Sequence, residues 1–347
     1  MAPLDHIPAP DELARAMAAL PPERREEVAA TLALPGHHLA CLWEEGTLAG
    51  LALGLARPTG GMMRLLLVWI APGVLDRTSA ALVLAERLAD QAKAVGLLGW
   101  RRGGGTVIDA ELLPAFGVEA EAEHWFGNLR LPVQEGLVYY RQSTRFTCGP
   151  ASLLMAMRLL QGEAPTRDAE IALWREATSI VSLSGPGGCD PFGLALAARR
   201  RGLQARVLAS TPGPMLMERA DTEEKRDLIR FVQEGFRAEV AASGLQAEQR
   251  AFEVEDLAAA LDEGAMVLVL VSQTLTQGRD TPHWILLHGR AGGAKDGWFL
   301  ISDPWTEPAR GEGEADARAL PVNASVLDRM AWYGEPPYRT AVVLRTA

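Results

Sequence analysis

The segment RQSTRFTCGPASLLMAM, residues 141–157, contains two residue types that suit acyl-transfer chemistry. Cys148 precedes Gly149 and Pro150 and then an apolar run, which predicts a helix beginning at the cysteine because proline is tolerated in the first helical turn. The helix dipole and free amides at that position stabilise a thiolate. Gln142 lies six residues upstream, where its amide can form an oxyanion hole with the Cys148 N–H. The alternatives are a packed cysteine and a solvated glutamine.

A nucleophilic thiol needs a base, and the chain has six histidines. His283 follows Pro282 and opens the predicted strand HWILLHGR. A histidine beside a loop suits the rim of a cleft, whereas His288, five residues further along, is expected on the opposite face of that strand. We therefore expect His283 to be the base. It stays open whether His288 takes that role, or whether both are core residues.

The base in turn needs a group that orients it. Asp303 ends the predicted strand in GWFLISDPW, and a carboxylate there can accept from the imidazole and stabilise its charged form. Asp-Pro is also a common turn at the end of a strand, which is the structural alternative. Asp280 and Asp296 lie in predicted loops and are weaker candidates.

The bulk composition limits the classes of function. The 347 residues suggest two domains, and 48% hydrophobic with 22% charged residues is typical of a globular chain. A net charge of -10 argues against nucleic acid or an anionic membrane as partner. No signal peptide and no apolar run of about 18 residues is visible. The three cysteines, Cys41, Cys148 and Cys189, form no CxxC pair, so we expect free thiols, no metal site and a cytoplasmic location.

The first part of the chain predicts a mixed set of elements. Residues 9–32 are expected to be helical and 38–57 to form a hairpin around Glu-Glu-Gly. Residues 62–72 predict a central strand and 76–96 a helix with Asp76 as its N-cap. LLGWRR then predicts a short strand, GGG a loop, ELLPAFG a short helix and HWFGNLRL a strand.

This order resembles the Gcn5-related N-acetyltransferase fold, which would make residues 1–131 one domain. WIAPGVLDRTSAALVL is similar to that family's strand, pyrophosphate loop and helix, which implies that Arg77, Thr78 and Ala80 lie where acetyl-CoA or another acyl-CoA binds. The family's loop carries glycines that let backbone amides reach the pyrophosphate, but this chain has none there. The domain is therefore either a working acyltransferase or a degenerate one kept for recognition or packing.

Residues 131–143 predict a linker, and 132–347 a second domain. Its helices come first and its antiparallel strands later, so the fold class is α+β. A charged helical stretch at residues 215–249 separates the Cys148 helix from the His283 strand, and it is expected to be an insertion that serves as a lid or a docking surface.

The joint pattern resembles the bacteriocin-leader-processing cysteine peptidases (cysteine peptidase family 39) over about residues 138–310. The resemblance implies a papain-like fold in which Cys148 is the nucleophile, His283 the base, Asp303 its orienter and Gln142 the oxyanion donor. The whole layout also resembles a group of stand-alone bacterial proteins with a loop like GGCDPFGL of this chain. Cys189 in that loop is expected to be structural, and the alternative is that it lines the site. Whether Trp284 and Trp305 line the cleft or belong to the core stays open.

These observations together predict a cysteine peptidase or amidase that acts on a peptide or protein without a required cofactor. One alternative is a pseudo-peptidase that binds a peptide without cutting it. Another is an N-acyltransferase whose activity resides in the first domain. Thiol acyltransferases and deamidases use the same acyl-enzyme chemistry, so they also stay open. The sequence makes no prediction about the oligomeric state.

Overall fold

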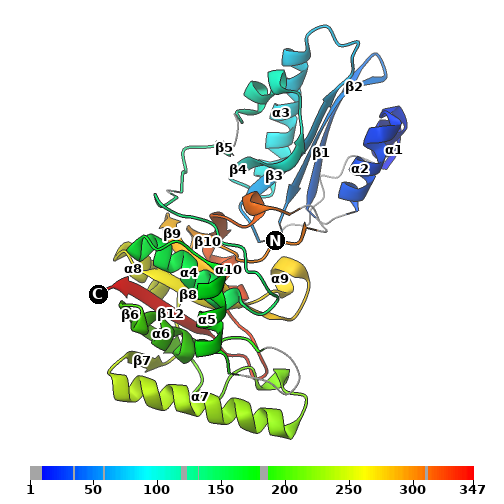
Figure 1. Ribbon diagram of the computed structural model, residues 1–347. Coiled ribbons are helices and arrows are strands. Elements are labelled where there is room, and N and C mark those ends of the chain that lie inside the picture. The colour runs from blue at the N-terminus through cyan, green and yellow to red at the C-terminus, as the bar shows by residue number, and fades with distance from the viewer. Residues whose placement is uncertain are drawn as a thin grey trace. The chain divides into compact units, whose positions relative to one another are not determined.

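The computed structural model describes residues 10–33, 36–57, 59–118, 123–131, 133–179, 187–308 and 312–347. The chain divides into two compact units. The first contains residues 1–130 and 307–316, and the second contains residues 131–306 and 317–347. Both combine helices with a sheet, as expected for the α+β class (Figure 1).

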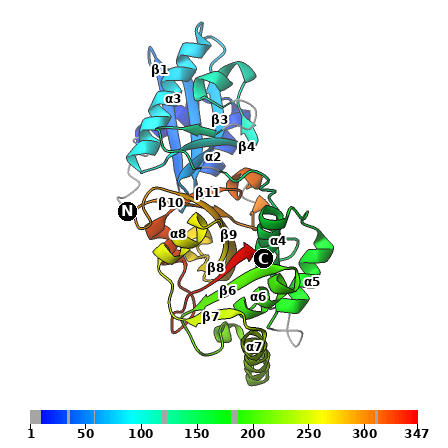
Figure 2. The same cartoon turned by 90° about the vertical axis from the view of Figure 1, so that its left-hand side faces the viewer.

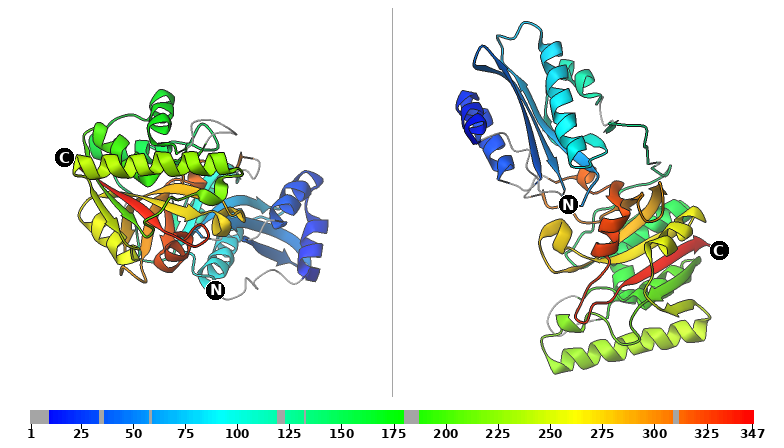
Figure 3. Two further views of the ribbon diagram at one scale, coloured as in Figure 1. Left: turned by 90° about the horizontal axis from the view of Figure 1, so that it is seen from below. Right: turned by 180° about the vertical axis from the view of Figure 1, so that it is seen from behind.

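The first unit is built on a five-stranded sheet with the order β1-β2-β3-β4-β5. Its strands are β1 (His37–Glu44), β2 (Thr47–Ala56), β3 (Met62–Ile70), β4 (Gly99–Val107) and β5 (Glu123–Trp125). Its helices are α1 (Pro10–Ala19), α2 (Pro22–Leu32), α3 (Arg77–Ala94) and the 3-10 helices η1 (Ala110–Phe116) and η4 (Glu314–Asp316). Helices α1 and α2 lie on one face of the sheet and α3 on the other (Figure 3, right).

Local sequence accounts for the ends of several of these elements. The predicted hairpin turn is confirmed, with Glu45 and Gly46 both at positive φ, 47° and 82°. Asp76 caps α3 as predicted, because its side chain accepts from the Ser79 N–H at 2.9 Å. The strand predicted at residues 62–72 is central in the sheet as β3, where β2 and β4 pair with its two edges.

Two predicted boundaries in this unit are wrong. The Gly103-Gly104-Gly105 segment is not a loop, because β4 runs through it to Val107. The pairing with β3 shifts there, and the Thr106 hydroxyl donates to the Leu65 carbonyl at 2.6 Å, so the glycines lie in an irregular part of a strand. The final strand, predicted over HWFGNLRL, is only Glu123–Trp125.

The second unit is built on a seven-stranded sheet with the order β11-β10-β9-β8-β12-β6-β7. Its strands are β6 (Leu203–Ala209), β7 (Gln246–Gln249), β8 (Met266–Ser272), β9 (Pro282–Ala291), β10 (Trp298–Ser302), β11 (Leu320–Asn323) and β12 (Thr340–Thr346). Its helices are α4 (Cys148–Gln161), α5 (Arg167–Ala177), α6 (Pro191–Arg200), η2 (Met217–Arg219), α7 (Glu223–Ser243), α8 (Val254–Asp262), α9 (Thr274–Gln277) and α10 (Ala324–Met330).

Alternation along the central strands of this sheet produces two separate hydrophobic cores. In β8, Leu268 and Leu270 pack with α4 and α6, whereas Val267 and Val269 pack with α8 and α10. Figure 2 shows α8 on one side of the strands and α4 on the other. A strand covered by helices on both faces must be apolar at every position, which explains the unbroken run AMVLVLV.

The second unit also departs from the prediction in three places. The helix predicted over 215–249 is shorter, since α7 spans only Glu223–Ser243. Residues 246–249 form β7 instead, which extends the sheet by pairing in parallel with β6. The prediction omitted β11 and α10, which follow β10 and pack on the α8 side of the sheet.

Candidate active site

Cys148 is the first residue of α4, so the predicted helix start is confirmed. The preceding Thr147 does not cap the helix with its side chain, because its hydroxyl is paired with the Thr144 hydroxyl at 2.9 Å. The first amides of a helix have no partner within the helix, so they remain directed at the space before Cys148. The thiol itself is 7% exposed. This end of α4 therefore offers a nearly buried thiol beside a cluster of N–H donors.

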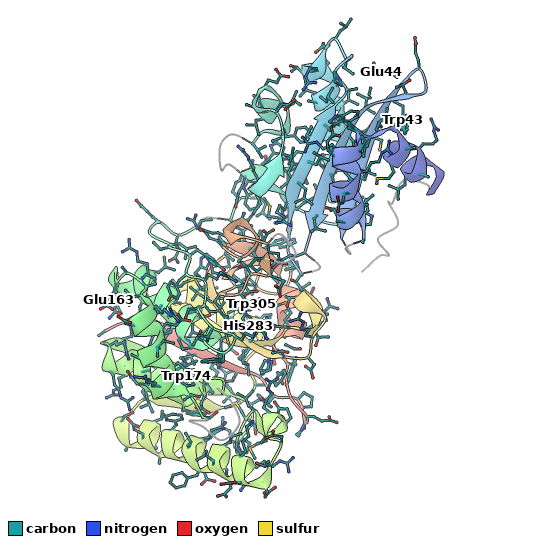
Figure 4. All side chains as sticks on the ribbon, turned by 45° about the vertical axis from the view of Figure 1, so that its right-hand side comes forward. Trp43, Glu44, Glu163, Trp174, His283 and Trp305 are labelled. Carbon is teal, nitrogen blue, oxygen red and sulfur yellow. The ribbon has the colours of Figure 1, made fainter. Side chains whose placement is uncertain are left out.

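His283 and Asp303 meet across two adjacent antiparallel strands. His283 lies at the start of β9, and Asp303 follows the last residue of β10. The His283 Nε2 atom is 2.7 Å from Asp303 Oδ1, and both side chains are buried. The imidazole also lies within hydrogen-bonding reach of the Cys148 thiol. The structure thus brings together three of the four predicted residues in the order Cys, His, Asp (Figure 4 labels His283).

The environment shifts the ionisation of Cys148 and His283 in opposite directions. Burial opposes charge on the thiol, but the hydrogen bond and the charge of His283, with the N–H groups of Trp284 and Gly149, outweigh it and lower the pKa of Cys148. Burial also opposes charge on the ring, yet Asp303 and Cys148 raise the pKa of His283 to about 10. Both shifts favour a thiolate–imidazolium pair over two neutral groups.

Asp303 is itself fixed by several main-chain contacts. Its Oδ1 accepts from the Trp305 N–H at 2.8 Å, and its own N–H donates to the Ala317 carbonyl at 2.9 Å. The Tyr139 hydroxyl donates to the Asp303 carbonyl at 3.0 Å. These contacts therefore hold the carboxylate in the position where it bonds to the imidazole.

Gln142 is buried and lies on the segment before α4. The turn that contains Asp303 also anchors this segment. Its N–H donates to the Pro304 carbonyl at 2.9 Å. Its Nε2 donates to the Thr144 carbonyl at 2.6 Å rather than to a group of Cys148, so one of its two side-chain N–H bonds remains for another acceptor. Gln142 also lines a surface hollow of about 320 Å³ with Trp305 and residues 141–145.

The residue that orders the segment before α4 was not predicted from the sequence. Glu170, on α5, is fully buried and accepts from the Tyr140 hydroxyl and from the Ser143 N–H, each at 2.8 Å. In the sequence it looks like an ordinary acidic residue in the first turn of a helix. Only the packing of α5 beside the segment reveals its role.

The other candidates are placed elsewhere. His288 is fully buried and bonds to the Ser302 hydroxyl at 3.1 Å, while burial and then Arg318 lower its pKa to about 3. Trp284 is a core residue that donates to the Cys189 carbonyl at 3.1 Å. Burial, and then the charges of Cys148 and Asp190, raise the pKa of Cys189 well above its usual value. Cys189 thus has the properties of a packed thiol.

The remaining loop residues are likewise not part of the hydrogen-bonded cluster of Cys148, His283 and Asp303. Asp280 and Asp296 are both exposed. Asp280 accepts from the Ser272 hydroxyl at 3.3 Å. Gly187 accepts from the Trp174 indole at 2.9 Å, and the Gly188 carbonyl from the Ser179 N–H at 3.4 Å, so both glycines belong to ordered backbone next to Cys189.

Arg77, in the predicted acyl-CoA loop of the first unit, is engaged in contacts within the protein. Arg77 begins α3 and forms ion pairs with Asp109 and, at 2.7 Å, with Glu111. It also donates to the Ile70 carbonyl at 3.2 Å. Ala80 is buried in the core beneath the sheet. Two carboxylates beside this helix start would repel a pyrophosphate.

The described residues contain neither a cluster suited to a metal ion nor a helix suited to a membrane. No group of three or more His, Cys, Asp or Glu side chains there is arranged to hold a metal ion. Among the helices of that same part of the chain, none has the length and apolar character needed to cross a membrane.

A family of known proteins is similar to the second unit of the chain. No curated protein matches the chain. A protein-family model described as "Peptidase_C39 like family" matches residues 137–345, which include the Cys148, His283 and Asp303 cluster. Because this match spans more than half of the 347 residues, the chain belongs to the Peptidase_C39 like family.

Proposed function

We propose that the chain is a cysteine peptidase or amidase whose second unit has a papain-like fold and cuts an amide bond in a peptide or protein. Cys148 would be the nucleophile, His283 the general acid, Asp303 the residue that positions His283, and Gln142 a donor to the oxyanion. The family match supports a peptidase-like second unit. The observation that carries the proposal is the hydrogen-bonded chain from the Cys148 thiol through His283 to Asp303, at the start of α4.

The first chemical step follows from the charge state of the pair. The Cys148 thiolate attacks the carbonyl carbon, and the electron pair of the C=O bond moves onto oxygen. In this proposal the free amides at the start of α4 stabilise the charge on this oxygen, and the unused N–H of Gln142 is a further donor. Donors that are already oriented need no reorganisation when the charge forms.

Collapse of this intermediate requires an acid. The protonated His283 gives its proton to the leaving amine, and the C–N bond breaks to leave an acyl group on Cys148. Water then attacks the thioester carbon while His283 takes its proton, and the C–S bond breaks to release the acid product and restore the Cys148 thiolate. Asp303 keeps Nε2 of the ring occupied throughout, so the other nitrogen faces the reaction.

The test is cleavage of a mixture of synthetic peptides by the full chain, followed by mass spectrometry. We expect products from the wild type and none from Cys148→Ala, while Cys189→Ala retains activity because that thiol is packed and has a raised pKa. Turnover by Cys148→Ala would refute the assignment of the nucleophile. Binding of peptides by the wild type without any cleavage would instead identify a pseudo-peptidase.

An N-acyltransferase function for the first unit has weaker support, because Asp109 and Glu111 occupy Arg77 at the start of α3. Titration calorimetry of the full chain with acetyl-CoA tests this directly. We expect no measurable heat of binding, and saturable binding would restore the acyltransferase as a candidate.

A further inference from the structure

A hollow beside Gln142 carries two arginines that the proposed reaction does not use. It measures about 320 Å³ and is lined by Arg141, Gln142, Ser143, Thr144, Arg145 and Trp305. These residues come from only two segments of the second unit, one leading into α4 and one following Asp303. The hollow therefore adjoins both the oxyanion donor and the turn that holds the catalytic carboxylate.

The wall that carries the two arginines is ordered by its own hydrogen bonds. Ser143 donates to Glu170, Gln142 donates to Pro304, and Thr144 pairs with Thr147 at the start of α4. These contacts fix the backbone on both sides of Gln142. Arg141 and Arg145 thus extend from a fixed frame, which lowers the entropic cost of binding a ligand between them.

The two positive charges in this wall take no part in the ion pairs of the described residues. Among the described residues no carboxylate pairs with Arg141 or with Arg145, although the chain as a whole has a net charge of -10. The Arg141 guanidinium lies 6.0 Å from the centre of the Trp305 ring. Glu170 packs against the same segment, but its two oxygens already accept from Tyr140 and Ser143. Both guanidinium groups are exposed and available to a ligand.

We propose that this hollow binds a carboxylate of the substrate close to the bond that is cut, so that the enzyme prefers acidic peptides. The proposal rests on the peptidase function above, and it adds the class of substrate. A guanidinium binds a carboxylate through two parallel hydrogen bonds, and Trp305 supplies a flat wall for the aliphatic part of the ligand. The carboxylate belongs either to a Glu or Asp side chain or to the C-terminus of the peptide.

The experiment measures binding and cleavage separately. Fluorescent hexapeptides that contain Glu or Gln at matched positions, each as a C-terminal acid and as an amide, are titrated against the full-length Cys148→Ala variant. The same peptides are incubated with the wild type to obtain kcat/KM. The arginine variants are Arg141→Gln, Arg145→Gln and the double variant. Arg175→Gln, an exposed arginine on α5 outside the hollow, is the control for a change of net charge.

Hydrogen bonds to a charged group are worth about 1.5–3 kcal/mol, so we expect a preference of about 10- to 100-fold for the acidic peptide. The preference should fall to near unity in the double variant and persist in Arg175→Gln. A preference that follows Glu in the amides identifies a side-chain carboxylate, and one that requires the free acid identifies the C-terminus. Equal binding of acidic and neutral peptides, or a preference that survives in the double variant, overturns the proposal.

These outcomes separate the two proposals. An arginine-dependent preference in binding, with no cleavage by the wild type, would support the carboxylate site and reject the peptidase. Cleavage without any preference for acidic peptides would support the peptidase and reject the carboxylate site.

Discussion

The charge on Cys148 is the residue-scale property on which the proposed chemistry depends. A buried thiol would normally stay neutral, because burial opposes charge. His283 reverses this by hydrogen bonding and by its own charge, and Asp303 in turn keeps His283 protonated. The ionisation of each residue therefore depends on its neighbours in this cluster.

The first prediction concerns the rate of iodoacetamide alkylation at pH 6. A thiol with the usual pKa is only about 0.3% thiolate there, so a lowered pKa of Cys148 gives a large increase. We expect Cys148 in the wild type to react at least about tenfold faster than in His283→Ala. Mass spectrometry follows each cysteine, with the buried Cys41 and Cys189 as internal controls. Equal rates in the two proteins would show that no thiolate–imidazolium pair exists.

The second prediction concerns the pH profile of the same reaction. Asp303→Asn removes the negative charge that raises the pKa of His283, so the ring loses its proton at lower pH. The thiolate then lacks a cationic partner, the pKa of Cys148 rises, and the acid limb of the profile moves to higher pH. Asp280→Asn and Asp296→Asn, in exposed positions, are the matched controls and should leave the limb unchanged. An unshifted limb in Asp303→Asn would remove the role of Asp303.

At the scale of elements, helices α5 and α6 pack closely against each other. Gly193, in the first turn of α6, shows this most clearly. A Cβ atom there would lie 2.9 Å from the Ala177 Cα atom and 3.0 Å from the Phe236 ring. The backbone at Ala177 cannot yield as a flexible side chain can. Helix α6 can therefore approach α5 this closely only with glycine at this position.

The third prediction compares two glycines in helices of the same unit. Gly193→Ala should destabilise the second unit by about 1–3 kcal/mol, because the added methyl group overpacks the contact with α5. Gly235→Ala in α7 meets no atom within 4 Å and should stabilise the protein by up to about 1 kcal/mol through helix propensity. The shifts in the urea midpoint of each variant test this. Shifts of the same sign in both variants would contradict the packing argument.

At the scale of the whole molecule, the chain passes from the second unit into the first at residue 307 and returns at residue 317. Asp316, at the end of this segment, pairs with Arg64 of the first unit at 3.0 Å, with both side chains buried. The Arg101 guanidinium also donates to the Ala315 carbonyl at 2.8 Å. A segment only a few residues after Asp303 in sequence thus belongs to the core of the other unit.

The fourth prediction tests this buried pair. Arg64→Met leaves the Asp316 carboxylate buried without the guanidinium, which should destabilise the first unit by about 3–5 kcal/mol. Adding Asp316→Leu should recover much of that loss, since it removes the stranded charge. Lys93→Met, which breaks the exposed pair with Asp90, is the control and should have a much smaller effect. Scanning calorimetry measures the thermal unfolding of all three variants. No recovery of stability in the double variant would contradict the charge argument.

The sequence by itself determined the α+β class and most helices and strands, because they depend on local signals. Asp76 as a cap, the Glu45-Gly46 turn and the proline after Cys148 each fix the chain within a few residues. The residue types of the candidate site were likewise visible, since a cysteine before Gly-Pro and a histidine at a strand start are unusual positions.

Only the tertiary structure decided which of these residues meet. Contacts between His283 and Asp303 depend on the register of β9 against β10, and the role of Glu170 depends on how α5 packs. Strands β7 and β11 have only four residues each, so local patterns did not reveal them. The hollow with Arg141 and Trp305 joins two segments more than 150 residues apart. Side chains at such separations are brought together by packing, which no local pattern records.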